Sequence, residues 1–174
     1  MQVIDFEQIV ANHSAFVYNV AYRMMGNRHD AEEVVQDAFL SAYRSRERFR
    51  GASQVTTWLY RITVNAALMR LRKKSRKVEV PTDPAVMVRS HDQPDRSETP
   101  DQAALSSELA DVIQASISTL PPDLRAAVVL RDVQGLSNDE AAAALGISVS
   151  ALKTRLHRGR VVLRGLLGPY LSPT

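Results

Sequence analysis

The sequence predicts an all-α protein of two small helical domains joined by a flexible linker. Apolar residues recur at spacings of three and four, which is the period of an amphipathic helix, and no segment alternates as a strand does. Aromatic residues make up only 6% of the 174 residues, so the core must be mainly aliphatic. Four prolines fall between positions 81 and 100, where no helical period is sustained.

The first predicted domain, residues 1–77, contains three helices. Apolar positions from Phe6 to Met24 indicate the first, which Gly26 ends. A second helix starts near Asp30, because the acids of "DAEE" complement the dipole of a first turn. After the break "RFRGAS", a third helix is expected over about 55–73.

The second predicted domain, residues 105–174, follows a linker over 78–104. Its first helix starts near Leu105, and "LPPD" begins the next with proline in the first turn. Ser137 is a good N-cap for "NDEAAAAL", Gly146 is a turn residue, and Ser148 or Ser150 can cap the last helix.

Residues 137–160 combine a short alanine-rich helix, a glycine turn and a cationic helix. This order is typical of a helix-turn-helix, whose second helix lies in a DNA major groove. Lys153, Thr154, His157 and Arg158 fall on one side and could read base edges, whereas Arg155 and Arg160 could hold phosphates. The alternative is a solvated basic helix of an ordinary bundle.

Charge is distributed in blocks along the chain. Residues 44–77 hold eleven cations and one acid, residues 79–111 hold eight acids and two cations, and five cations without an acid follow from Lys153 onward. Two basic blocks separated by an acidic one indicate a polyanionic partner with two footprints.

The first basic block also carries aromatic residues. Phe49, Trp58 and Tyr60 are interleaved with arginines, a combination that suits single-stranded nucleic acid because bases stack on aromatic rings beside a positive groove. The alternative is that Phe49 and Trp58 belong to the core. The acidic segment "DAEEVVQDAF" is either a solvated face or a docking face for a basic partner helix.

Several functional classes are excluded or unsupported. The chain has no cysteine, which rules out disulfides, thiolate catalysis and cysteine-ligated zinc. Its four histidines are scattered, and no phosphate loop or catalytic triad can be assembled. We therefore expect no enzyme, metal, cofactor or small-molecule substrate. The sequence has no apolar run of membrane-spanning length and no signal peptide, so a cytoplasmic protein is expected.

Four stretches in order carry a family resemblance: "DAEEVVQDAFLSAYRS", "RFRGASQVTTWLYRITVNAA", "LPPDLRAAVVLRDVQGLSNDEAAAALGIS" and "SALKTRLHRGR". From about Phe6 to Leu166, apart from the linker, the chain resembles the two-domain extracytoplasmic-function (ECF) sigma factors. The resemblance implies promoter recognition and melting as a dissociable subunit of RNA polymerase, in response to stress and under an anti-sigma factor.

The resemblance also implies site residues. Glu33, Gln36 and Asp37 would bind the clamp helices of core polymerase. The −10 promoter element would be contacted by Phe49, Arg50, Ser53, Thr57, Trp58, Arg61 and Asn65. The second domain would meet the polymerase flap and contact the −35 element through Ser150, Lys153, Thr154, Arg155, His157 and Arg158.

Four positions depart from the family pattern. Val55 stands where an aromatic is frequent, and Asn138 replaces a commoner aromatic. His157 lies at a variable position, so promoter preference does not carry over. Gly159 replaces the usual alanine, and because glycine weakens a helix interior by up to about 1 kcal/mol we expect the last helix to fray or end there.

Two other functions stay open at this stage. A stand-alone helix-turn-helix repressor or activator would bind duplex DNA tightly without polymerase, although no dimerisation helix is evident. An RNA-binding protein would use the arginine-rich segment 70–77 and would not need a helix-turn-helix.

Overall fold

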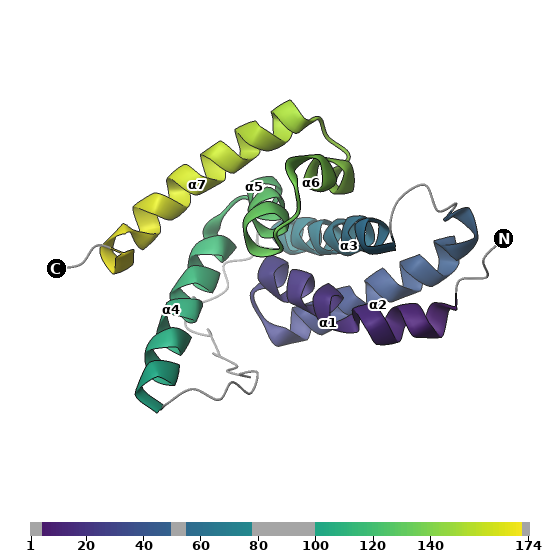
Figure 1. Cartoon of the computed structure of the whole chain (residues 1–174), viewed down its shortest axis with the longest axis horizontal. Helices are drawn as coiled ribbons and strands as arrows, with labels where there is room; N and C mark the ends of the chain where they lie inside the picture. Colours follow the sequence, from purple (N-terminus) through teal and green to yellow (C-terminus); the bar gives the residue numbers. More distant parts are fainter. Residues whose placement is uncertain (1–4, 50–54, 78–99, 172–174) are drawn as a thin grey trace.

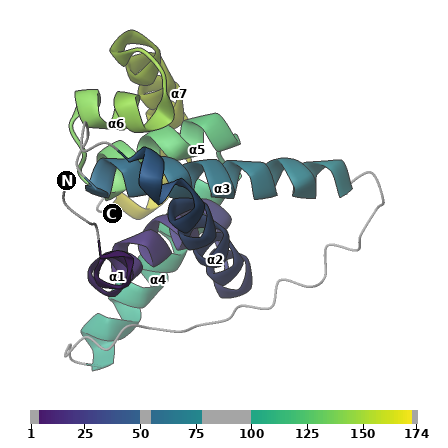
Figure 2. The same cartoon turned by 90° about the vertical axis from the view of Figure 1, so that its right-hand side faces the viewer.

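The computed structural model describes residues 5–49, 55–77 and 100–171. Over these ranges the secondary structure is helical with turns and contains no strand, which confirms the all-α prediction. Figures 1 and 2 show the helices of the first domain packed beside those of the second.

Helices α1 (Phe6–Met25) and α2 (Arg28–Ser45) form an antiparallel pair joined by a tight turn. Gly26 ends α1 in the left-handed region at φ 81°, which glycine adopts without steric cost. The Asn27 side chain then accepts a hydrogen bond from the Asp30 backbone N–H at 2.9 Å. Because Asn27 is the cap, α2 begins two residues before the predicted start at Asp30.

Helix α3 (Val55–Lys77) packs against both α1 and α2, and the short 3₁₀ turn η1 (Arg46–Arg48) follows α2. The helix extends to Lys77, four residues beyond the predicted end near Lys73. Fully buried aliphatic side chains fill the space between the three helices: Val17, Val20, Val34, Leu59 and Val64.

The second domain consists of α4 (Pro100–Thr119), α5 (Pro122–Val128), the π-helical turn η2 (Val129–Val133), α6 (Asn138–Leu145) and α7 (Val149–Leu171). Helix α4 begins five residues before the expected Leu105. Pro122 occupies the first turn of α5, as predicted. A complete capping box starts α6, in which the side chains of Ser137 and Glu140 bond each other's backbone N–H groups.

The helix-turn-helix is formed by α6, the turn at Gly146 and α7. Gly146 is left-handed at φ 65°, and the Ser148 hydroxyl accepts from the Ala151 N–H at 3.1 Å. Ser148 rather than Ser150 therefore caps α7, and Ser150 is left exposed on its first turn.

The two domains share one apolar core, a question that the sequence could not decide. Buried Val20, Met24 and Val64 of the first domain belong to the same cluster as Leu120 and Leu130 of the second. Figure 1 shows α5 between α7 and the first domain, and α4 beside α1.

A buried arginine strengthens this junction. Arg125 of α5 donates to the carbonyl of Met24 in α1 at 2.6 Å, and to the carbonyls of Ser118 and Leu120 at 2.8 and 2.9 Å. Burial lowers the pKa of Arg125. The three carbonyls offset the cost of placing its charge there, because buried cations require hydrogen-bond partners.

No helix in the described part of the chain combines the length and apolar character needed to cross a membrane.

Candidate nucleic-acid and polymerase interfaces

Helix α7 divides its residues between a packed face and an open face. Leu152, Leu156 and Gly159 are buried at the spacing of successive turns. Five exposed residues line a shallow surface hollow of about 500 Å³: Ser150, Lys153, Thr154, His157 and Arg158. The structure thus brings together five of the six residues predicted for the −35 element. We name this surface the −35 face.

Gly159 fits the packing of α7 against α5. A Cβ atom at this position would lie 2.8 Å from Cγ2 of Val128, closer than two carbon atoms can approach. The expectation that the helix frays or ends at Gly159 is wrong, since α7 continues to Leu171. Tertiary packing at this close approach outweighs the low helix propensity of glycine.

The two cations predicted to hold phosphates differ in their surroundings. Arg155 is half-buried, beside the open face of α7. Arg160 forms two hydrogen bonds to the carboxylate of Asp132, at 2.9 and 2.6 Å. These bonds raise the pKa of Arg160, which stays charged and is paired with the carboxylate of Asp132. Arg160 thus joins α7 to η2, and its contact with phosphate stays a prediction.

The aromatic residues expected near the −10 element are partly packed. The rings of Phe49 and Trp58 lie 4.9 Å apart and are inclined by 31°. Both side chains are half-buried, and Trp58 packs beside buried Leu59. Each ring thus combines a structural contact with partial exposure to solvent. Arg50 and Ser53, the other residues predicted for this loop, lie outside the described residues.

The remaining residues of the predicted −10 set follow on α3. Asn65 is exposed. Arg61 donates to the backbone carbonyl of Ala143 in α6 at 2.6 Å. Thr57 lines a hollow of about 200 Å³ together with Leu136 and other residues of the second domain. We name the surface formed by Phe49, Thr57, Trp58, Arg61 and Asn65 the −10 face.

Two acidic residues of α2, Glu33 and Asp37, are already paired with a cation of α3. Arg70 contacts Glu33 and donates to Asp37 at 2.8 Å. Burial alone would lower the pKa of Arg70, but the bonds to the two carboxylates outweigh it and raise the pKa. Glu33 and Asp37 keep 38% and 47% of their side-chain surface exposed, and Gln36 is exposed, so a partner could still reach them. Sequence reasoning missed Arg70, because its partners are more than thirty positions away.

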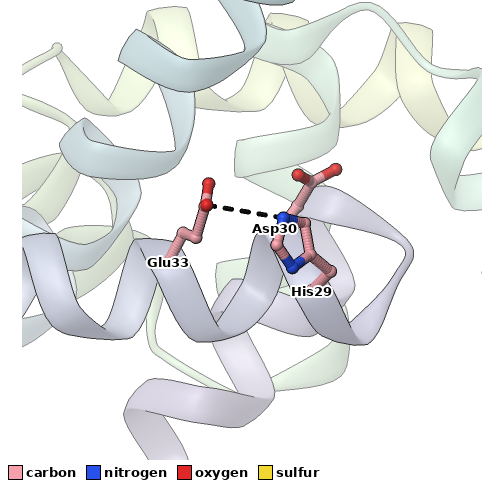
Figure 3. A group of neighbouring side chains, drawn as sticks. All are labelled: His29, Asp30 and Glu33. Atoms are coloured by element: carbon pink, nitrogen blue, oxygen red, sulfur yellow. Dashed lines mark ion pairs between the residues drawn. The ribbon is translucent and has the colours of Figure 1, made fainter.

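One group of side chains has the composition of a metal site. His29, Asp30 and Glu33 gather at the start of α2, with 3.4 Å between His29 Nε2 and Glu33 Oε1 (Figure 3). Both carboxylates already accept from cations, Asp30 from Lys74 and Glu33 from Arg70. A metal ion would have to displace these bonds. We assign no metal here, and the expectation of no metal site stays a prediction.

Each of the two domains matches a known family model. The family model for Sigma-70 region 2 matches residues 9–77, and that for Sigma-70 region 4 matches residues 110–163. The ECF RNA polymerase sigma factor SigW of Bacillus subtilis is 37% identical over 163 residues, with 91% of this chain and 87% of SigW covered. The chain belongs to the ECF sigma factors.

This sigma factor is also similar to one further curated relative and to two proteins of known structure. SigE of Mycolicibacterium smegmatis is 37% identical over 171 residues, which span 98% of this chain but only 64% of SigE. The sigma factor RpoE of Bartonella quintana, solved with the anti-sigma factor NepR, superposes with a TM-score of 0.73 at 26% identity, over 95% of this chain and 98% of RpoE. CnrH, solved with the cytosolic domain of CnrY, gives 0.65 at 29% identity over 94% and 88% of the two chains.

Proposed function

We propose that this sigma factor binds core RNA polymerase, recognises −10 and −35 promoter elements, and initiates transcription without catalysing a reaction itself. One observation carries the proposal: a single chain holds a region 2 and a region 4, and each exposes a face with the chemistry of nucleic-acid binding. The chain spans 64% of the length of SigE of Mycolicibacterium smegmatis, so the activity of the whole relative comes to this chain only as a proposal.

In this proposal the −35 face lies in the major groove. Lys153 and Arg158 are the donors suited to guanine, whereas Thr154 and His157 can donate or accept. The Thr154 hydroxyl donates to the Ser150 carbonyl at 3.1 Å, which leaves its oxygen lone pairs available to a base amine. Two further residues complete the −35 set. Ser150 lies in the first turn of α7, and Arg155 is half-buried beside the open face of the helix.

The −10 face would hold the separated strand. Phe49 and Trp58 offer ring surface to a base, and Arg61 with Asn65 would hold its backbone or edge; Arg50, Ser53 and Thr57 complete the proposed set. Extruding a base from duplex DNA costs a few kcal/mol. Contacts of the −35 face and of polymerase must offset this cost, so neither domain alone should open a promoter.

Core polymerase would be held by both domains. Glu33, Gln36 and Asp37 on α2 present an acidic surface to the basic clamp helices, and the second domain meets the flap. Because Arg70 already neutralises Glu33 and Asp37, a basic partner must either share these carboxylates or displace Arg70.

We further propose that an anti-sigma factor controls the protein in the cytoplasm, in response to stress. The similar sigma factor RpoE was solved with the anti-sigma factor NepR, and the similar protein CnrH was solved with the cytosolic domain of CnrY. The similarity to RpoE and CnrH covers both domains of this chain. A partner of the same kind could therefore contact both domains.

Run-off transcription with purified core polymerase and a library of genomic fragments tests the function. We expect discrete transcripts that appear only when this protein is added. Tight duplex binding without polymerase and without transcripts would support a stand-alone regulator. Binding of RNA through the segment 70–77, unaffected by changes in the −35 face, would support an RNA-binding protein.

A further inference from the structure

The exposed residues of α3 form a row that extends beyond the proposed −10 set. Over residues 55–71 the exposed residues of this helix are Arg61, Asn65 and Met69, at intervals of four. Arg61 and Asn65 belong to the proposed −10 set, whereas Met69 belongs to none of the proposed sets. Met69 is 59% exposed, and no other large apolar residue in the described part of α3 is classed as exposed.

Two exposed arginines, Arg72 and Arg76, continue this row toward the end of α3. Successive residues of an α-helix are rotated by about 100°, so all five side chains leave the helix within a sector of about 80°. We call these five residues the α3 row. Arg70 and Lys74 lie on the other side of the helix and bind carboxylates of α2. Within the described ranges of the chain, neither Arg72 nor Arg76 forms such an ion pair.

The two ends of α3 suit different forms of DNA. Trp58 lies near the start of the helix, packed against Phe49, and bases of a separated strand stack on such rings. No aromatic residue follows Tyr60 in α3, and the cations of the α3 row suit the phosphates of a duplex. Figure 2 shows the later part of α3 extending past the other helices, so that a duplex can approach it.

The direction of strand separation orients this helix on a promoter. Separation extends from the −10 element toward the start site, because the template must be single-stranded where it is copied. The aromatic end of α3 therefore faces the separated strand, and the cationic end faces the duplex upstream of the −10 element. Met69 lies between Asn65 and Arg72, at the side of this duplex.

The side chain of Met69 matches one group of the major groove. A thioether is a weak acceptor and no donor, so it gains little from the polar edges of bases. The 5-methyl group of thymine is the apolar group that the major groove displays. Methionine is unbranched and flexible, so its end can adapt to a methyl group, while Arg72 beside it would hold a phosphate.

We propose that Met69 is a specificity-determining residue that contacts the 5-methyl group of a thymine in the duplex just upstream of the −10 element. Four residues of helix advance by about 6 Å, or about two base pairs of DNA, so this thymine lies close to the position that Asn65 meets. The inference rests on the proposed sigma function. It extends sequence recognition by α3 from the separated strand into the duplex.

Uracil tests this contact, because it pairs as thymine does and lacks only the 5-methyl group. The templates derive from a promoter on which the wild-type protein and core polymerase initiate. At each of the first three base pairs upstream of the −10 element, thymine is placed in one strand and then in the other. Every template is also prepared with uracil in place of that thymine. The readout is the ratio of the initiation rates on the thymine and uracil templates.

The wild-type protein should initiate about fourfold faster with thymine than with uracil at one position, the value of one buried methyl group. 5-Methylcytosine should exceed cytosine there by a similar factor. Met69→Ala should abolish the difference between thymine and uracil, whereas Met69→Leu, which keeps an apolar side chain of similar size, should retain it. Leu109→Ala is the matched control, because it truncates another exposed apolar residue on α4 and should leave the ratio unchanged.

Two results would overturn the inference. One is equal initiation by the wild-type protein on thymine and uracil templates at every position. The other is a Met69→Ala protein that initiates more slowly on all templates but keeps the wild-type ratio, since Met69 would then support the fold or contact polymerase. Both results leave the proposed function intact. If the wild-type protein initiates on no promoter, the proposed function is wrong and the inference fails with it, so the two failures are distinguishable.

Discussion

Gly159 of α7 and Val128 of α5 lie in close contact where the two helices pack together. A Cβ on residue 159 would lie 2.8 Å from Cγ2 of Val128. Valine is β-branched and has little rotamer freedom with which to move away. This contact therefore constrains how α7, the helix that carries the −35 face, packs against α5.

Gly159→Ala should destabilise the protein by about 1–3 kcal/mol, because an added methyl overpacks the contact with Val128. Gly165→Ala on the same helix is the matched control, since a Cβ there meets nothing within 4 Å. The control should gain up to about 1 kcal/mol from the better helix propensity of alanine. Urea unfolding measures both. Equal stability of the two variants would show that the close approach is not a constraint.

Arg158→Ala should weaken initiation that depends on the −35 element by about 1–3 kcal/mol, the value of a bidentate base contact. Arg164→Ala, six residues further along α7, removes the same charge away from the −35 face and is the control. Initiation is compared across −35 sequence variants for both proteins. If Arg158→Ala keeps the sequence preference and rate of wild type, Arg158 does not read the element.

Glu33→Lys should weaken binding to core polymerase at least tenfold, because it reverses the charge on the proposed docking surface of α2. Glu32→Lys makes the same change at the neighbouring position, where only an exposed pair with Arg28 is lost. Affinity is measured by fluorescence anisotropy, and thermal unfolding checks both folds. If Glu33→Lys binds core polymerase as tightly as wild type, the acidic surface of α2 is a solvated face and does not dock polymerase.

Asp30 should make stability depend on pH. Burial alone would raise the pKa of Asp30, but bonds from Lys74 and Asn27 outweigh it and lower the pKa below its ordinary value. A carboxylate with a lowered folded pKa stabilises the protein above its unfolded pKa of about 3.9, and this contribution disappears as pH falls through the folded value.

Asp30→Asn should therefore cost about 1–3 kcal/mol near neutral pH. The difference from wild type should shrink as pH falls below about 4. Urea unfolding between about pH 3 and 7 measures it. A difference that stays constant over this range would mean that the charge of Asp30 contributes nothing.

Local signals in the sequence were sufficient for most helix ends. Ser137 with Glu140, Gly26, Gly146 and Pro122 each act within a few residues, so their positions in caps and turns follow from residue type. The open face of α7 was also predictable, because a helical period separates Lys153, Thr154, His157 and Arg158 from the buried Leu152 and Leu156.

Contacts between distant segments were not predictable. The bond between Arg160 and Asp132 joins segments 28 positions apart, and Gly159 was expected to end a helix that it instead packs against α5. The pairing of Arg70 with Glu33 and Asp37, and the shared core of the two domains, depend on tertiary geometry that no local pattern contains.

We propose that this one chain, bound to core polymerase, contacts promoter DNA through two separate faces. The most direct test is in vitro initiation on one responsive promoter prepared in four forms: intact, changed at the −10 element, changed at the −35 element, and changed at both. We predict transcripts from the intact template and a loss of at least tenfold when either element alone is changed. Undiminished transcription from the template with both elements changed, or none from any template with active core polymerase, would contradict the account.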